Sequence, residues 1–214
     1  MGTSNPVAAA RRRLYGDGPQ WTRTEGDFAR ISLPRADGDA LRDLLVAERV
    51  GTVVEIGLAY GASALAIGEA LWAAATPWHV IIDPFQTSEF SGAGRDVLRE
   101  AGLDAICRLI EEPSSQVLPR LVADGLTADA AFVDGSHRFH EVFLDLYYLR
   151  RLVRPGGLIV LDDLSLPSVA AAASYFVTNT GWEHLPTRNT TRLRAFRLPD
   201  PPVEPAFRDF RPFL

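Results

Sequence analysis

Cysteine is almost absent from this sequence, because Cys107 is the only one among 214 residues. A single thiol excludes an intramolecular disulfide, and it excludes a zinc site built from several cysteines of the same chain. Long apolar runs are missing as well, since no segment approaches the ~20 residues that a membrane-spanning helix requires. The sequence therefore predicts a cytoplasmic protein that does not insert into a membrane.

An excess of positive charge is also missing. The chain has 22 basic and 27 acidic residues, which gives a formal net charge of -5. Proteins that bind along the phosphate backbone of nucleic acid carry the opposite balance. The basic run at 11–13 is interpreted as a solvated helix face. We therefore expect a small-molecule partner and no nucleic acid.

The length of the chain suits one domain with one full-sized core. Residues 1–36 mix glycine, proline and Trp21 without clear periodicity, which predicts an irregular N-terminal arm or lid. Residues 37–198 are predicted to form the domain itself. Residues 199–214 begin with four closely spaced prolines, which cannot belong to a central strand. They predict a C-terminal arm.

Short β-branched runs alternate with longer helical patterns inside the predicted domain. Strands are predicted at 52–56, 79–83, 105–110, 130–134 and 158–161, and helices at 40–46 (capped by the acidic residues at 37–39), 62–75, 96–101, 115–123, 139–152 and 169–177. Repeated strand and helix units imply a parallel sheet. The last two segments, 182–185 and 191–198, predict an antiparallel pair joined by a polar turn. The expected fold class is α/β, a single Rossmann-like, doubly wound, mostly parallel sheet with an antiparallel last strand.

A glycine-bearing segment follows the first predicted strand. Gly57 and Gly61 allow a sharp turn and the close approach of a ligand, and Ser63 can donate a hydrogen bond near the helix start. Asp83 lies 28 residues after Glu55, at the end of the next strand, where a carboxylate can accept both hydroxyls of a ribose. The pattern predicts a site for a nucleoside-containing cofactor.

Two other interpretations of this segment stay open. The glycines could serve only close packing of helix on strand, with Asp83 capping the turn before Pro84. A nicotinamide dinucleotide site would require Gly-x-Gly-x-x-Gly, and the third glycine is missing before the helix. An oxidoreductase therefore ranks last.

Acidic residues gather at the ends of two later strands. Asp134 ends one predicted strand, while Asp162 and Asp163 follow the next, so a parallel sheet would bring three carboxylates to one edge. A hard divalent cation relieves the repulsion, and magnesium prefers oxygen ligands. The pattern predicts a magnesium site formed by these three residues. The alternative is that Asp134 belongs to a turn with Gly135 and the acidic pair caps the next helix.

His137 lies three residues beyond Asp134. An imidazole with an unperturbed pKa of about 6.5 suits proton removal near neutral pH. His137 is therefore the predicted catalytic base, although a lone histidine at a helix start often bonds only to backbone. His79 and His184 are predicted to be structural or surface residues.

Taken together, these segments resemble the class I S-adenosylmethionine-dependent methyltransferases over roughly residues 37–197. The resemblance is carried by Glu55 to Ser63, Asp83, Asp134-Gly135-Ser136-His137, and Arg154-Pro155-Gly156-Gly157 followed by Asp162-Asp163. More narrowly, the chain is similar to metal-dependent small-molecule O-methyltransferases of the catechol and caffeoyl-coenzyme A type, and closer to bacterial enzymes that methylate antibiotic sugars or other hydroxyls.

The resemblance implies roles for individual residues. It places S-adenosylmethionine against Glu55, Gly57, Gly61 and Ser63 at its methionine end, against Asp83 at its ribose, and against Asp134. It also places Glu111 near the adenine, and the related antibiotic-sugar enzymes carry a histidine at the place of His137.

The predicted function is transfer of a methyl group from S-adenosylmethionine to a hydroxyl of a small molecule, a natural product or a sugar, with magnesium as second cofactor. The alternatives are a metal-independent methyltransferase and a non-catalytic nucleoside-binding module. Trp21, Phe85 and Phe90 are candidate walls of the acceptor pocket. The aromatic tail with Phe207, Phe210 and Phe213 could pack against a second copy of the chain if it is exposed.

Overall fold

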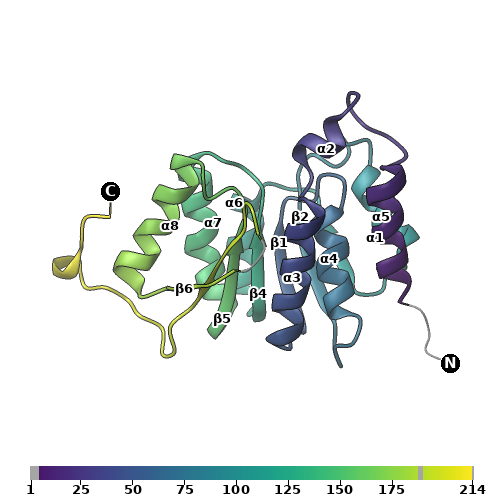
Figure 1. Ribbon diagram of the computed structural model, residues 1–214. Helices are drawn as coiled ribbons and strands as arrows, with labels where there is room; N and C mark the ends of the chain where they lie inside the picture. Colours follow the sequence, from purple (N-terminus) through teal and green to yellow (C-terminus); the bar gives the residue numbers. More distant parts are fainter. Residues whose placement is uncertain (1–4, 188–189, 214) are drawn as a thin grey trace.

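A computed structural model describes residues 5–187 and 190–213. They form a seven-stranded sheet with the order β3-β2-β1-β4-β5-β7-β6 (Figure 1). The strands are β1 (Thr52–Ile56), β2 (Trp78–Ile82), β3 (Cys107–Ile110), β4 (Ala128–Val133), β5 (Val153–Leu161), β6 (Glu183–Leu185) and β7 (Arg194–Arg197). The helices are α1 (Pro6–Asp17), α2 (Asp27–Ile31), α3 (Arg35–Ala47), α4 (Ala62–Leu71), α5 (Ala93–Glu100), α6 (Ser114–Ala123), α7 (Phe139–Leu152) and α8 (Pro167–Thr180), with a short 3-10 turn η1 (Phe207–Asp209).

The pairing of the strands confirms the predicted fold class. β1 pairs in parallel with β2 and β4, and β5 continues the parallel set beside β4. β7 runs antiparallel to both of its neighbours, β5 and β6. Strands covered on both faces are rich in apolar residues, and β1 and β4 in the middle of the sheet are mostly apolar and buried along most of their length.

Helices cover both faces of the sheet. α1, α3, α4 and α5 lie on one side, and α6, α7 and α8 lie on the other (Figure 1). Apolar residues of α3 and α4 form a core with one face of the central strands, and residues of α6, α7 and α8 form a second core with the opposite face. None of the described helices is both long and apolar enough to cross a membrane.

The predicted irregular arm at the N-terminus contains a docked helix instead. Asn5 caps α1, because its side chain accepts hydrogen bonds from the backbone N–H groups of Val7 at 3.0 Å and Ala8 at 3.3 Å. Leu14 is completely buried in a cluster shared with α4 and α5. The prediction of a solvated basic face was wrong for Arg11, which is buried and pairs with Glu69 at 3.0 Å. These internal pairs interrupt the apolar periodicity that sequence analysis relies on.

Helix α3 begins at Arg35, earlier than predicted, so Asp37 lies within its first turn and does not cap it. The carboxylate of Asp37 accepts hydrogen bonds from the backbone N–H groups of Thr191 at 2.8 Å and Arg192 at 3.1 Å, and from the Thr191 hydroxyl at 2.9 Å. Asp37 therefore ties α3 to the segment between β6 and β7. The predicted polar turn between these strands includes residues 188 and 189, which lie outside the described residues.

The C-terminal residues run along α8. Asn179 exchanges two hydrogen bonds with the backbone of Arg211, at 2.8 and 3.0 Å. The ring of Phe213 packs edge-on against Tyr175 of the same chain, with 5.4 Å between centroids, so this residue of the aromatic tail is not free for a second copy as predicted. Phe207 is 87% exposed. Apart from η1 the tail has no regular secondary structure in its described part, as the prolines predict.

Candidate active site

Four neighbouring parallel strands, β2, β1, β4 and β5, end at the same edge of the sheet. Ligands of doubly wound sheets bind at this carboxyl edge, where the loops after the strands come together. The predicted site residues belong to these strand ends or to the start of the following helix. The fold therefore brings residues from 55 to 163 to one edge, as expected from the sequence.

The turn between β1 and α4 is tight and rests against the end of β4. Gly57 has φ +90°, and a Cβ atom at this position would lie 2.2 Å from the carbonyl oxygen of Asp134. Gly61 also has a positive φ, +84°. Ala59 has φ +45°, a conformation that costs free energy for a residue with a side chain. Gly57 is thus required by packing, and its contact with a cofactor stays a prediction.

Asp83 holds the same turn from the end of β2. Its Oδ2 accepts the backbone N–H groups of Leu58 and Ala59, both at 2.9 Å, and the side-chain amide of Gln86 at 3.0 Å. Its Oδ1 accepts the backbone N–H of Phe85 at 2.8 Å. Asp83 is only 3% exposed. The carboxylate fixes the shape of the glycine turn, and its contact with a ribose stays a prediction.

Glu55 and Ser63 lie beneath the turn and bond to each other. The Ser63 hydroxyl donates a 2.5 Å hydrogen bond to Glu55, whose second oxygen is 2.8 Å from Nε2 of His79. Both Glu55 and His79 are fully buried. His79 is therefore structural, as predicted, and also lies near Cys107, with 3.6 Å between Nδ1 and Sγ. Burial raises the pKa of Cys107 to about 12, so this thiol stays protonated at neutral pH.

Asp134, His137 and Asp163 form a cluster at the carboxyl edge. Nε2 of His137 lies 3.2 Å from Oδ2 of Asp163 and 3.8 Å from Oδ1 of Asp134. One candidate ligand atom from each residue lies within 4.8 Å of the others. Asp163 has φ +54°, so its backbone holds a sparsely populated conformation. The His137 side chain is 43% exposed, which leaves it accessible.

The third predicted metal ligand, Asp162, points to a different partner. Its Oδ2 forms a 2.5 Å ion pair with Arg192, while its Oδ1 is buried without a hydrogen-bond partner among the described residues. Arg192 also approaches Asp163, with 3.5 Å between Nε and Oδ1. Sequence reasoning missed Arg192, because it comes from the segment before β7 and no local motif marks it.

The crowding of carboxylates changes their acidity. Burial, followed by the nearby Asp162 charge, raises the pKa of Asp134 well above its ordinary value. Burial also raises the pKa of Asp162, although the Arg192 guanidinium acts in the opposite direction. The carboxylate oxygens of Asp134 and Asp163, together with the unpartnered Oδ1 of Asp162, are the hard oxygen donors that a divalent cation such as magnesium prefers. The residues present thus fit the predicted magnesium ion.

Residues 23–28 of the N-terminal segment, called the latch below, pack over Tyr60 in the glycine turn. The Tyr60 hydroxyl donates a 2.6 Å hydrogen bond to the buried Asp27, and the backbone N–H of Arg23 donates to the Tyr60 oxygen at 3.1 Å. Rings of Phe28 and Phe90 pack on Tyr60 with centroid distances of 5.9 and 5.2 Å. Of the predicted acceptor walls, Phe90 is therefore buried beside the latch, while Trp21 and Phe85 are 39% and 53% exposed.

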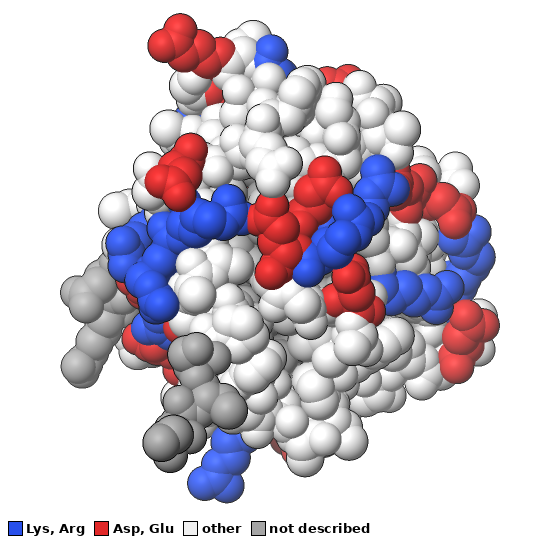
Figure 2. Space-filling model, turned by 90° about the vertical axis from the view of Figure 1, so that its right-hand side faces the viewer, with Lys and Arg blue, Asp and Glu red and all other residues white. Residues whose placement is uncertain are grey.

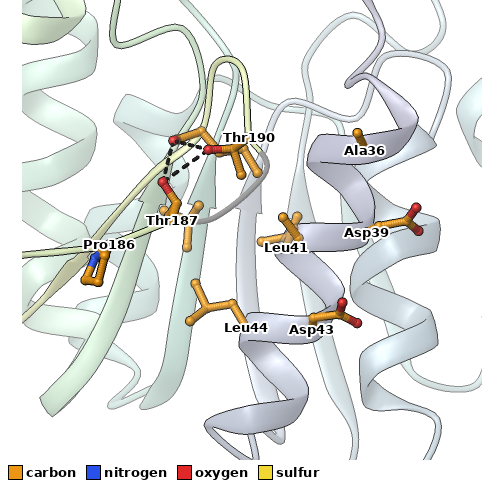
Figure 3. Close-up of a pocket in the computed structure, with 11 residues that line it drawn as sticks. Ala36, Asp39, Leu41, Asp43, Leu44, Pro186, Thr187 and Thr190 are labelled. Carbon is orange, nitrogen blue, oxygen red and sulfur yellow. Dashed lines mark hydrogen bonds between the residues drawn. The ribbon is translucent and has the colours of Figure 1, made fainter.

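A cavity of about 490 Å³ lies away from the predicted residues, between α3 and the segment preceding β7 (Figure 3). Leu41 and Leu44 give it an apolar wall, and the hydroxyls of Thr187 and Thr190 bond to the carbonyl of Leu193 on the other side. None of the predicted cofactor or metal residues lines this cavity. It is large enough for a small molecule, but its lining shares no residue with the carboxylate cluster.

Charges on the face that carries α1 and α3 are interleaved. Figure 2 shows arginine and acidic side chains alternating over this face. Arg11 of α1 and Arg42 of α3 pair with Asp39, Asp43 and Glu69 at 2.7 to 3.3 Å. The visible face therefore does not carry a continuous basic surface of the kind that binds nucleic acid.

Fold and site together describe a doubly wound α/β protein whose polar residues gather at the carboxyl edge beside a glycine turn. The chain belongs to the methyltransferase domain family, whose sequence model matches residues 54–164, just over half of its length. The matched region contains every predicted cofactor, metal and catalytic residue. The predicted resemblance to class I methyltransferases is confirmed.

Solved structures show the same fold. An O-methyltransferase, TomG, from Streptomyces achromogenes, involved in tomaymycin synthesis and bound to SAM, is 16% identical with a TM-score of 0.66, over 92% of this chain and 91% of that one. An O-methyltransferase from Bacillus cereus bound to SAH is 11% identical with a TM-score of 0.65, over 92% of both chains. An SAH-bound methyltransferase from Podospora anserina is 17% identical with a TM-score of 0.66, over 92% and 89%. Comparison with curated proteins finds no match. At these identities the likeness establishes the fold alone.

Proposed function

We propose that the protein transfers a methyl group from S-adenosylmethionine to a hydroxyl of a small molecule. The cluster of Asp134, His137 and Asp163 carries the proposal, because it brings an imidazole that can serve as a base next to two carboxylates at the edge of the sheet where doubly wound folds bind their ligands. The O-methyltransferases of similar fold, with SAM or SAH bound, support the choice of oxygen as acceptor.

The cofactor would lie along the turn from Gly57 to Gly61. Asp83 stiffens this turn through the N–H groups of Leu58 and Ala59, so the backbone of the turn is ordered before a ligand arrives. Glu55 and Ser63 would act from beneath, by fixing the first turn of α4 on β1. S-adenosylmethionine supplies an electrophilic methyl group on its sulfonium when bound. The chain's own contribution is to hold the acceptor oxygen in line with that group.

His137 would remove the proton from the acceptor hydroxyl. All 22 basic residues of the chain are arginines, so no lysine is present to take this role. A hydrogen bond from Nε2–H to Asp163, over the 3.2 Å observed, leaves Nδ1 free to accept the proton. The two carboxylates beside Nε2 then stabilise the imidazolium that forms.

Magnesium would be held by Asp134 and Asp163. Asp162, the third predicted ligand, is already paired with Arg192. The ion supplies Lewis acidity that favours the ionised form of a bound hydroxyl. The alternative to the magnesium site is a metal-independent methyltransferase, in which Arg192 supplies the positive charge beside the carboxylates.

We also propose that the protein acts in the cytoplasm. The exposed rings of Phe207 and Phe210 in the tail are proposed to pack against a second copy of the chain.

Calorimetric titration with S-adenosylhomocysteine, followed by methyl transfer to a panel of catechols, phenols and sugars, tests the proposal. We expect micromolar binding and turnover that a chelator abolishes. Binding of NADH in place of the nucleoside product would refute the cofactor, and turnover unaffected by the chelator would leave a metal-independent enzyme. Binding without any turnover would favour the non-catalytic module. Light scattering of the purified chain measures its oligomeric state.

A further inference from the structure

Backbone hydrogen bonds to Asp37 hold Arg192 beside the carboxylate cluster. Asp37, at the start of α3, accepts the N–H groups of Thr191 and Arg192 and thereby fixes the segment that carries the guanidinium. Asp37 itself is completely buried. The position of the guanidinium is therefore set by two elements far apart in the sequence, α3 and the segment before β7, and not by the chance contact of a surface arginine.

The two oxygens of Asp163 have different partners. Oδ1 is 3.5 Å from Nε of Arg192, while Oδ2 is 3.2 Å from His137. Asp162, buried except for 2% of its surface, gives its Oδ2 to Arg192 at 2.5 Å. The cluster is thus divided into an arginine side, with Asp162 and one oxygen of Asp163, and a histidine side, with Asp134 and the other oxygen of Asp163.

A fixed positive charge beside such a cluster has two opposite effects. It lowers the repulsion among the carboxylates when no cation is bound, and it repels any cation that enters. Burial amplifies both, because water screens the charges less than it does at the surface. The net result is a cluster that is stable without a cation and that binds one less tightly than three free carboxylates would.

We infer that Arg192 is a positioning residue that occupies one oxygen of Asp162, Oδ2, and limits the affinity of the site for divalent cations. It leaves Asp134 and one oxygen of Asp163 to receive the ion, while His137 stays free to act as the base. The inference rests on the proposed metal site and goes beyond it, because it assigns the strength of cation binding to a residue outside the acidic motif. A purely structural role, in which Arg192 only ties the β7 segment to β5, would give the opposite result: its removal would disorder the site and weaken cation binding.

Titration with Mn²⁺, followed by electron paramagnetic resonance of the free ion, separates these roles in the intact chain. We expect Arg192→Gln to bind Mn²⁺ about tenfold more tightly than the unmodified protein, since a charge is removed a few ångströms from the ion. Arg192→Lys keeps the charge but cannot bridge two carboxylates, so its affinity should fall between the two. Thermal unfolding without metal should occur at a lower temperature in Arg192→Gln, and Mn²⁺ should restore it.

Arg42→Gln is the matched control. Arg42 also pairs with several carboxylates, Asp39, Asp43 and Glu69, and its replacement changes the net charge by the same amount. Its Mn²⁺ affinity should stay unchanged. Equal or weaker Mn²⁺ binding by Arg192→Gln would overturn the inference, and, if that variant does not fold, weaker binding by Arg192→Lys would do so. If no variant binds Mn²⁺, the metal part of the proposed function fails with it, whereas titration with S-adenosylhomocysteine decides separately about methyl transfer.

Discussion

Tyr60 and Asp27 lie 33 residues apart in the chain and are joined by a buried 2.6 Å hydrogen bond from the phenol to the carboxylate. Tyr60 belongs to the glycine turn, and Asp27 begins α2 in the N-terminal segment. Burial raises the pKa of Tyr60, and its bond to Asp27 acts in the same direction, so the phenol keeps its proton and remains a donor. The order of the proposed cofactor turn is therefore coupled to that of the segment that covers it.

Replacement of Tyr60 by Phe should loosen this cover. The lost bond to a charged acceptor is worth about 1.5–3 kcal/mol in the free energy of unfolding. Trypsin should cleave after Arg23 and Arg30 sooner than in the unmodified protein, and affinity for S-adenosylhomocysteine should fall. Tyr15→Phe is the control, because it removes a 2.6 Å bond to the carbonyl of Leu33 without touching the turn. Equal cleavage rates for the two variants would contradict the coupling.

Asp145 should make stability depend on pH. It is a buried residue of α7, and burial raises its pKa to about 7. The folded protein then holds a proton that the unfolded chain, with a pKa near 3.9, has already lost. The contribution of Asp145 to the free energy of unfolding is therefore largest below about pH 4. It falls as the pH rises from 4 to about 7 and stays low at higher pH.

The Asp145→Asn variant should lack this dependence. At pH 8 it should be more stable than the unmodified protein by about 2–4 kcal/mol, and at pH 4 the difference should vanish. Urea unfolding at a series of pH values measures both. Asp124→Asn, at the exposed end of α6, serves as the control. A stability difference that does not change with pH would show that Asp145 is not protonated in the folded state.

The central strands of the sheet could be predicted because β1, β2 and β4 are mostly apolar segments that end at a glycine or an acidic residue. Helix α7 begins and ends at the residues that its periodicity predicts, Phe139 and Leu152. Helix α1 was missed, because Arg11 belongs to the buried face and its partner Glu69 lies 58 residues away. A sequence pattern shows the type of each residue, but it does not show which distant charged residue allows an arginine to be buried.

The site shows the same division. Asp134, His137 and Asp163 could be predicted, because position after a strand determines the edge at which a residue emerges. That Asp162 faces Arg192 could not, since neighbouring residues leave a strand in different directions and the arginine, 30 residues later in the chain, comes alongside only through the pairing of β7 with β5. Likewise, the sequence suggested Glu55 as a ligand contact, while its pairing with His79 depends on the register of β1 and β2.

His137→Asn should remove catalysis but not binding. Loss of a general base lowers kcat by about 10²–10⁴-fold, whereas affinity for S-adenosylhomocysteine should stay within about twofold. His140→Asn is the matched control, because His140 lies three residues later and its side chain is 76% exposed. Steady-state rates with the best acceptor of the panel provide the comparison. If His137→Asn retained full kcat, another group would have to take the proton.

Substitutions at Gly57 and Gly102 distinguish the close contact of the turn with Asp134 from the general cost of a side chain at positive φ. Gly57→Ala places a methyl group 2.2 Å from the carbonyl oxygen of Asp134, so β1, β4 or the turn must move. Gly102→Ala has a similar φ, +69°, but meets no atom within 4 Å. The control should lose about 1 kcal/mol of unfolding free energy from backbone strain alone. Gly57→Ala should lose several times as much, and any folded protein should bind S-adenosylhomocysteine and Mn²⁺ more weakly, because Asp134 is displaced with its carbonyl. Equal losses of stability in the two variants would mean that the turn yields freely, and that the close contact between Gly57 and Asp134 does not position the carboxylate.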